Sequence, residues 1–369
     1  MNSRDYYIDY LRLLVIVSIV ILHSAVTYSG FGNWHFIDES PIDDLSKLVS
    51  ALFICFTYSY SMSFLFLIAA YYAANSYSRK GKMNFINGRI YRLGLPVGLF
   101  SFFIYPLTMY FLYVAGEKEA LNFKEYLLSG HFLSGTGPLW FALALLIFSL
   151  FYAAIGRKQN VTAKNLPGIK VTIIAILLVG TASFLLRLIF PMGVEILNMP
   201  ISNFAYYIAL FVVGIKAYQY DWFNQIEYNY AKKWLGSTFV IGIVGWFAIM
   251  LFSGVFEQSE AVLSGGFNWP SYSYSVWESF LIFGMSIGLL GTFKRKINKT
   301  NKLMVILSKN SFSVYVWHTP ILVGVSLMLR DITIYPLLKI AIVALTTLSF
   351  SFFLSHYVFR KAPLVKEIM

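Results

Sequence analysis

Residues 8–28 read IDYLRLLVIVSIVILHSAVTY, and this stretch decides the fold. A helix needs about 20 mostly apolar residues to cross the hydrocarbon core of a bilayer, and the stretch is long enough. Only one basic residue, Arg4, precedes it, and the stretch itself contains Arg12 and His23. A cleaved secretory signal has a more basic start and an uninterrupted apolar centre, so the sequence predicts a membrane helix that is retained.

Nine further apolar stretches follow the first. The second is long enough to be tilted or broken, and the sixth and eighth contain polar residues. The segments between stretches reach only about twenty residues, which is too short for an independent fold. We therefore expect an all-α integral membrane bundle of about ten helices, forming one domain over residues 1–369 with no fused soluble domain. The expected helices are 8–28, 46–74, 90–115, 138–156, 169–190, 200–220, 234–255, 274–293, 309–329 and 336–359.

The composition agrees with a membrane protein. Hydrophobic residues make up 58% of the chain and charged residues 12%, with a mean hydropathy of +0.66. A soluble domain carries about 25% charged residues. The net charge of +12 lies in short segments between apolar stretches, which argues against a nucleic-acid partner. The single cysteine, Cys55, cannot form an internal disulfide and belongs to no metal-binding pattern, so no metal is expected.

Lysine and arginine are distributed unevenly between alternate loops. One set of loops, together with the two terminal segments, contains 22 of these residues, and the opposite set contains 4. Basic residues accumulate on the cytoplasmic side of a membrane protein. Because the number of helices is even, both termini are expected in the cytoplasm. The four basic residues of the opposite side are Lys47, Lys118, Lys124 and Arg330.

Seven ionisable residues fall within the apolar stretches, where such groups are costly and usually face a cavity or a partner. Arg12 and His23 are eleven residues apart, so both project from one helix face, about 16 Å apart along the axis. The alternative is that Arg12 reaches lipid phosphate and His23 bonds to a neighbouring helix. The seven are Arg12, His23, Arg187, Glu278, His318, Lys339 and His356.

Arg89 and Arg92 lie at the inner end of the third expected helix and can form a fork for phosphates. Their alternative role is to fix topology and contact anionic lipid. Glu278 lies at a depth similar to His23, where it can orient a histidine or stand in water at the rim. His318 near mid-membrane is either catalytic or a hydrogen-bonding group between helices.

The remaining members carry less information. Arg187 is placed to reach the outer surface, and Lys339 and His356 are interpreted as anchors. His35 and His131 lie in outer loops. The sequence contains no nucleophile elbow, P-loop, dinucleotide fingerprint or metal-binding helix motif, which excludes the common soluble catalytic frameworks but not an enzyme.

Taken in order along the chain, several motifs together resemble the bacterial acyltransferase 3 family. Two positions depart from the family's usual pattern: Pro138 stands where a histidine is frequent, and Ala70 where a glycine is frequent. Within the family the chain is most similar to the glucan-modifying branch, which includes the glucan succinyltransferase. The motifs are IDYLRL at 8–13 with His23-Ser24, FLFLIAAY at 64–71, Phe85 to Pro96 with both arginines, GPLWF at 137–141, FVVGI at 211–215 and LSKNSFSVYVWHTP at 307–320.

The resemblance implies a membrane O-acyltransferase of the bacterial inner or plasma membrane. Its donor is a cytoplasmic acyl-coenzyme A carrying an acetyl, succinyl or similar group, and its acceptor is a hydroxyl of an extracytoplasmic cell-envelope carbohydrate. We expect Arg12, Arg89 and Arg92 to bind the donor. His23 is expected to act as general base or acyl carrier with Glu278 as its partner. The substrate-binding candidates are His318, Trp140 and Tyr315.

Two other interpretations stay open. A lipid or glycan transporter or flippase would share the bundle, the buried charges and the aromatic residues without acyl-transfer chemistry. An inactive sensor built on the same fold is the other, and the presence of both Arg12 and His23 speaks mildly against it. The resemblance also leaves open whether the acceptor comes to the membrane protein itself or is served by a separate extracytoplasmic partner protein.

Overall fold

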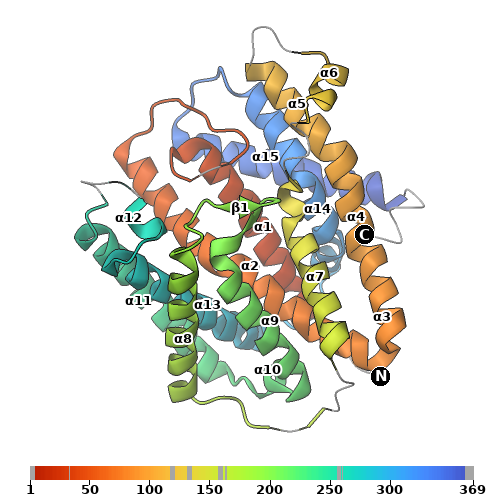
Figure 1. Cartoon of the computed structure of the whole chain (residues 1–369), viewed down its shortest axis with the longest axis vertical. Coiled ribbons are helices and arrows are strands. Elements are labelled where there is room, and N and C mark those ends of the chain that lie inside the picture. The colour runs from red at the N-terminus through yellow and green to blue at the C-terminus, as the bar shows by residue number, and fades with distance from the viewer. Residues whose placement is uncertain are drawn as a thin grey trace.

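The computed structural model describes residues 5–32, 34–116, 121–130, 135–156, 161–162, 164–255, 259 and 261–361. Within these ranges ten helical spans are long and apolar enough to cross a membrane, which confirms the predicted all-α bundle (Figure 1). They are α1 (Tyr6–Ser29), α2 (Asp44–Lys80), the third span Lys82–Gly116, the fourth span Gly137–Ile155, α8 (Ile169–Arg187), the sixth span Ile201–Gln219, α11 (Tyr228–Phe252), α13 (Trp269–Lys296), α14 (Lys302–Met328) and α15 (Pro336–Tyr357).

Three of these spans are composite. The third contains α3 (Lys82–Arg89), the π-helix η1 (Ile90–Gly94), α4 (Leu95–Leu99), the π-helix η2 (Phe100–Ile104) and α5 (Tyr105–Gly116). The fourth joins the 3₁₀ turn η4 (Gly137–Leu139) to α7 (Trp140–Ile155), and the sixth joins η5 (Ile201–Asn203) to α9 (Phe204–Gln219). The short elements outside the spans are α6 (Phe123–Leu128), the hairpin β1 (Glu195–Ile196) and β2 (Met199–Pro200), α10 (Trp222–Gln225), α12 (Ala261–Ser264) and, after the last span, η6 (Phe359–Lys361).

Helix α2 runs unbroken for 37 residues. The second expected helix, which was long enough to be tilted or broken, is therefore not broken. It begins after Asp43, whose side chain accepts a hydrogen bond from the Ser46 N–H at 2.9 Å and so caps the first turn. It extends to Lys80, six residues beyond the predicted 46–74. The extension is polar, and hydropathy alone therefore places the boundary too early.

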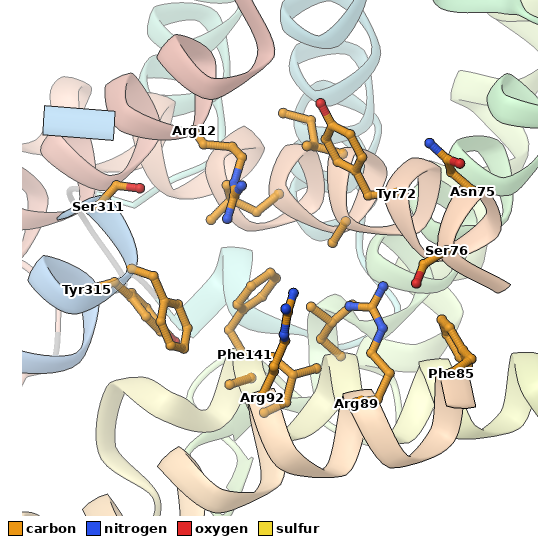
Figure 2. Close-up of a pocket in the computed structure, with 18 of the residues that line it drawn as sticks. Arg12, Tyr72, Asn75, Ser76, Phe85, Arg89, Arg92, Phe141, Ser311 and Tyr315 are labelled. Carbon is orange, nitrogen blue, oxygen red and sulfur yellow. The ribbon is translucent and has the colours of Figure 1, made fainter. Parts of the chain in front are cut away.

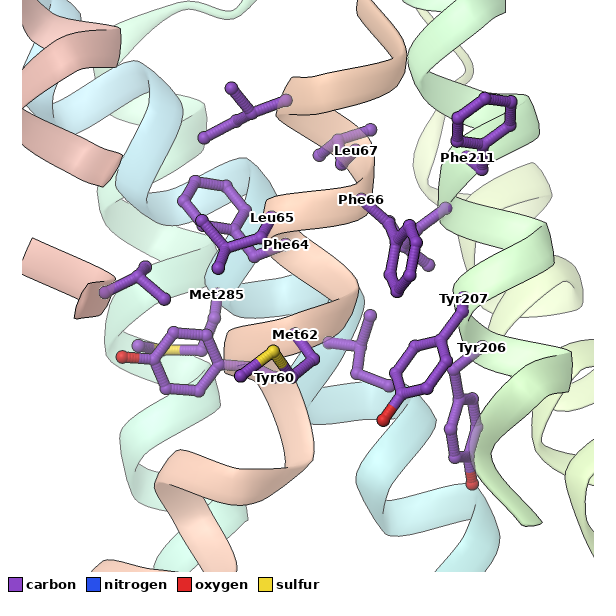
Figure 3. Packing of buried hydrophobic residues seen from close by; sticks show 14 of the residues in the cluster. Tyr60, Met62, Phe64, Leu65, Phe66, Leu67, Tyr206, Tyr207, Phe211 and Met285 are labelled. Carbon is purple, nitrogen blue, oxygen red and sulfur yellow. The ribbon is translucent and has the colours of Figure 1, made fainter. Parts of the chain in front are cut away.

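The core of the bundle lies along α2. On one side α2 packs against α9 and on the other against α13, and aromatic and aliphatic side chains of all three interdigitate (Figure 3). The contact with α9 is close because Gly214 has no side chain: a Cβ there would lie 2.3 Å from the Leu67 carbonyl oxygen. Small residues at such positions let membrane helices approach to backbone contact.

Burial falls from the centre outward. In the most apolar window of α2, 78% of residues are buried, against 28% in α8, in α11 and in the third span. Figure 1 shows α1 and α2 in the middle of the bundle, between the third span on the right and α11 on the left. The outer helices therefore present their apolar side chains to lipid, and α1 and α2, with α13 and α14 packed on α1, surround the interior.

Candidate functional site

A cavity of about 510 Å³ lies between α1, α2, α3, η1, α7 and α14. Two features mark it as a site for an anion. None of the side chains that line it is acidic, and five are permanently or normally cationic. Arginine and lysine gathered without a neutralising carboxylate are typical of phosphate-binding surfaces. The five cations are Arg12, Arg79, Lys80, Arg89 and Arg92.

The two arginines of the third span owe their placement to an irregular backbone. Pro96 has no N–H to continue the helical ladder, and the Leu95 N–H instead bonds to the carbonyl of Ile90, five residues back. The resulting π-helical turn carries Arg92, and Arg89 ends the regular helix before it. Such π-helical turns are frequent at functional sites. The predicted pair is thus brought to one wall of the cavity.

Arg12 enters from the opposite wall. Figure 2 shows its guanidinium directed across the cavity toward Arg89 and Arg92. Its side chain is 44% exposed, and the nearest carboxylate oxygen, on Asp9, is 4.0 Å away. An ion pair at that distance and exposure contributes little, so Arg12 is available to an incoming anion. The three arginines expected from the sequence to bind the donor therefore line one cavity.

Tyr315 closes one end of the cavity (Figure 2). Its hydroxyl donates to the backbone carbonyl of Pro138, at the start of the fourth span. Trp140 was predicted to contact substrate, but it does not line the cavity. Its ring packs instead against Tyr207 with centroids 5.6 Å apart, and the next residue, Phe141, is the one that faces the cavity.

Two histidines lie beyond Tyr315. The His318 ring is centred 6.0 Å from the Tyr315 ring and 5.4 Å from the His23 ring. The Nδ1 atom of His318 is 2.7 Å from the Tyr315 carbonyl oxygen, which can only accept a hydrogen bond. The proton is therefore on Nδ1 in the neutral ring, and Nε2 is left unprotonated. Arg12 thus lines a cavity that α14 also lines, and the His23 ring lies beside His318 of α14.

A residue that sequence reasoning missed covers one face of the His23 ring. The Trp34 ring is stacked on the imidazole with centroids 3.6 Å apart and planes at 17°, and it lies 6.5 Å from His318. The lines from the His23 ring centre to the Trp34 and His318 ring centres meet at nearly a right angle. Trp34 therefore covers the face of the His23 ring, and His318 lies at its edge. His35 packs on Trp34 at 4.5 Å. An adjacent tryptophan and histidine in a short loop after the His23 helix was the available indication.

Glu278 is not the partner of a histidine in this structure. Its Oε2 accepts hydrogen bonds from Arg187 Nη2 at 2.6 Å and from the Tyr206 hydroxyl at 3.3 Å. Arg187 also donates to Ser275 and Asn203, and both charged side chains are buried. The expected outward reach of Arg187 is likewise wrong, because its charge is neutralised inside the bundle. The ion pair ties α8 to α13.

Comparison with known proteins identifies the family. The family model described as an acyltransferase domain matches residues 5–356. The chain belongs to the acyltransferase 3 family. Three curated relatives, each named glucans biosynthesis protein C, come from Escherichia coli O1:K1 / APEC, O139:H28 (strain E24377A / ETEC) and O9:H4 (strain HS). Each is 24% identical to this chain over 234 residues.

The alignment with these relatives is partial. It covers 58% of this chain and 58% of each relative's length. No solved structure matches the chain at a comparable level. Membership of the acyltransferase 3 family, together with the ten spans, makes this a multi-pass membrane acyltransferase. The family match covers all of the cationic cavity and both histidines.

Proposed function

We propose that this acyltransferase moves an acyl group from cytoplasmic acyl-coenzyme A to a hydroxyl of a cell-envelope carbohydrate on the other side of the membrane. The observation that supports this most is the order of groups along α1 and α14. Five cations surround one cavity, Tyr315 ends it, and His318 and His23 follow immediately. A donor with phosphates at one end and a thioester at the other fits such an order.

In this proposal the coenzyme A phosphates bind between Arg12 on one wall and Arg89 and Arg92 on the other. Planar guanidinium groups bind phosphate oxygens in pairs, which a single ammonium cannot do. The pantetheine arm then extends along α1 past Tyr315. Eleven residues of helix between Arg12 and His23 rise about 16 Å, comparable to an extended arm, so one helix can span both ends of the donor.

The transfer step uses His23. Its imidazole accepts the proton of the acceptor hydroxyl as the hydroxyl oxygen attacks the thioester carbonyl carbon. The tetrahedral intermediate then collapses, the carbon–sulfur bond breaks, and the thiolate leaves with the proton from the imidazolium. The alternative is that His23 first carries the acyl group itself and then passes it to the hydroxyl. Both routes yield the same ester and free coenzyme A.

The proposal that the acceptor is a carbohydrate rests on the comparisons. The curated relatives are named for the biosynthesis of glucans, and glucans are rich in hydroxyl groups. The basic loops also support cytoplasmic entry of the donor, because Arg79, Lys80 and Arg89 lie on the side where Lys and Arg accumulate. The identity of the acyl group is left to experiment.

The experiment uses the purified full-length protein in lipid nanodiscs. Release of free thiol from acetyl- and succinyl-coenzyme A is measured with and without periplasmic glucan, and the glucan is examined by mass spectrometry for the added acyl mass. Glucan-dependent thiol release with a matching mass gain supports the proposal. Movement of glucan across the membrane without thiol release would favour the transporter interpretation instead.

The donor cavity makes a separate prediction. Arg89→Ala or Arg92→Ala should raise the Kd for coenzyme A by about 10-fold or more, the cost of losing a charge-assisted contact. Lysine at either position should restore only part of the affinity. Arg295→Ala is the matched control, because Arg295 is exposed on α13 outside the cavity. Calorimetric titration decides: unchanged affinity in both cavity variants contradicts the donor assignment.

A further inference from the structure

A buried ion pair joins loop 30–43, of which residues 30–32 and 34–43 are described, to α15. The Nζ atom of Lys339 lies 2.8 Å from Asp38 Oδ2, and each side chain is only 5% exposed. The two residues are 301 positions apart in the sequence. The sequence favours an anchoring role for Lys339, but in the structure its charge instead turns inward against the loop.

The other polar groups of Asp38 are also occupied. Its second carboxylate oxygen accepts the Ser40 N–H at 2.9 Å, and its own N–H donates to the Thr27 carbonyl at 2.8 Å. The Lys339 ammonium lies 5.0 Å from the centre of the Tyr28 ring. Burying two charges gains little net stability compared with apolar packing, but it demands one specific geometry. The pair therefore defines where the loop sits rather than simply adding stability.

Four residues before Asp38, the same loop carries Trp34, whose ring covers the face of His23. The indole Nε1 atom of Trp34 is buried and has no hydrogen-bond acceptor among the described residues. An unpaired buried N–H is costly unless a substrate or water oxygen accepts it. The loop thus places an aromatic cover and an unused donor beside the proposed catalytic imidazole.

We propose that Lys339 is a positioning residue for the acyl-transfer site: through Asp38 it fixes loop 30–43 so that Trp34 stays stacked on His23. The stacked indole holds the imidazole ring in one plane and keeps water from one face, while the indole leaves the edge of the ring uncovered. The Trp34 N–H then serves a substrate oxygen next to His23. The inference rests on the proposed function, in which His23 exchanges a proton with the acceptor.

Variants of the ion pair can distinguish a role in positioning Trp34 from a role in stability alone. Removing one partner leaves the other charged and buried, which costs about 3–5 kcal/mol and can prevent folding. The informative variant is therefore Asp38→Asn with Lys339→Met, which removes both charges together. It is compared with Trp34→Ala and with the triple variant, which combines Trp34→Ala with Asp38→Asn and Lys339→Met. Arg330→Met is the matched control, because Arg330 is a half-exposed cation of the same predicted outer side that contacts the Asp331 carboxylate and the Ala115 carbonyl at the surface, away from loop 30–43.

The first readout is independent of acyl transfer. Diethylpyrocarbonate acylates unprotonated imidazoles, and peptide mass spectrometry gives the rate at each histidine, with exposed His356 as internal reference. We expect several-fold faster labelling of His23 in Asp38→Asn/Lys339→Met and in Trp34→Ala. The triple variant should label no faster than Trp34→Ala, because the ion pair acts only through the tryptophan. A folded double variant whose His23 is labelled at the wild-type rate overturns the inference. So does a triple variant in which the two increases in labelling rate add.

The second readout is kinetic. The double variant should lose about 10–100-fold in kcat, the cost of slightly misplacing a catalytic group, while its affinity for coenzyme A stays that of wild type. Arg330→Met should change neither. A folded double variant with wild-type kcat overturns the inference while leaving the proposed function intact. If wild-type protein itself releases no thiol, the proposed function fails, and the labelling experiment still reports whether Lys339 positions Trp34.

Discussion

His23 is surrounded by rings rather than by charges. Trp34 covers its face, His318 lies at its edge, and its side chain has no carboxylate partner among the described residues. A base or a nucleophile needs a neutral imidazole, and no carboxylate among the described residues contacts this ring to favour its protonated form. This environment explains how a histidine can serve in acyl transfer without the acidic partner that soluble enzymes commonly use.

His23→Gln should abolish acyl transfer while coenzyme A still binds. Glutamine keeps the size and the hydrogen-bonding capacity of the side chain but cannot carry a proton. Loss of general-base catalysis costs about 10²–10⁴-fold in rate, and more if an acyl-histidine is obligatory. Single-turnover transfer by folded protein, with coenzyme A titration as the control, measures this. Near wild-type transfer by the variant would remove His23 from the mechanism.

Glu278→Ala should act on stability rather than on chemistry. It leaves Arg187 charged and buried without its carboxylate, which costs about 3–5 kcal/mol. Replacing both, as Arg187→Met with Glu278→Leu, should recover much of the loss. Thermal unfolding in detergent and activity per folded molecule separate the two effects. A fully stable Glu278→Ala protein that has lost transfer would restore the catalytic role predicted from sequence.

The loop 30–43 is the element whose structure the sequence revealed least. The length of the apolar stretches placed all ten helices, because a membrane span is a local property of about 20 residues. Position along a helix is also local, and it separates Arg12 from His23 by about 16 Å on one helix. Lateral neighbours are not local. Glu278 and His23 share a predicted depth but not a neighbourhood. Under the inference above, the position of Trp34 depends on Lys339, 301 residues after Asp38.

The folded conformation of loop 30–43 should lose stability in mild acid. Burial lowers the pKa of His35 to about 4, from an ordinary value of 6.5. The unfolded loop therefore binds a proton below about pH 6.5 that the folded loop refuses, and stability falls as the pH drops from 6.5 toward 4. His35→Phe should flatten this part of the profile. Melting temperatures of both proteins at pH 7 and pH 5 test it; equal losses in the two would contradict it.

The cationic cavity shows why the helix boundaries were the weaker part of the prediction. Helix α2 continues past its apolar stretch because Asn75, Ser76 and Arg79 line the cavity and need no lipid contact. The third span begins at Lys82, before the predicted residue 90, for the same reason. Its residues Asn84 and Phe85 line the cavity wall opposite α2. A polar helix end that faces an internal cavity looks like a loop to any hydropathy criterion.

For the molecule as a whole, the distribution of basic residues predicts that both termini and the cavity face the cytoplasm. Cysteine placed at position 84 or 40, in a Cys55→Ser background, tests this in intact cells. Both positions are exposed, and Cys55 is buried. A membrane-impermeant reagent should label position 40 and not position 84. Labelling at 84 with silence at 40 would reverse the orientation and the side from which the donor enters.

The cavity binds the part of the donor that the reaction does not change. Under the proposed assignment, Arg12, Arg89 and Arg92 hold phosphates that are identical in acyl-coenzyme A and in free coenzyme A. Binding energy shared by substrate and product gives no help to turnover. The spent carrier therefore competes with the loaded one for the same arginines. Cells would then set the rate of envelope modification through the ratio of loaded to free carrier, and a starved cell would cease to decorate its surface before its carrier pool shrank.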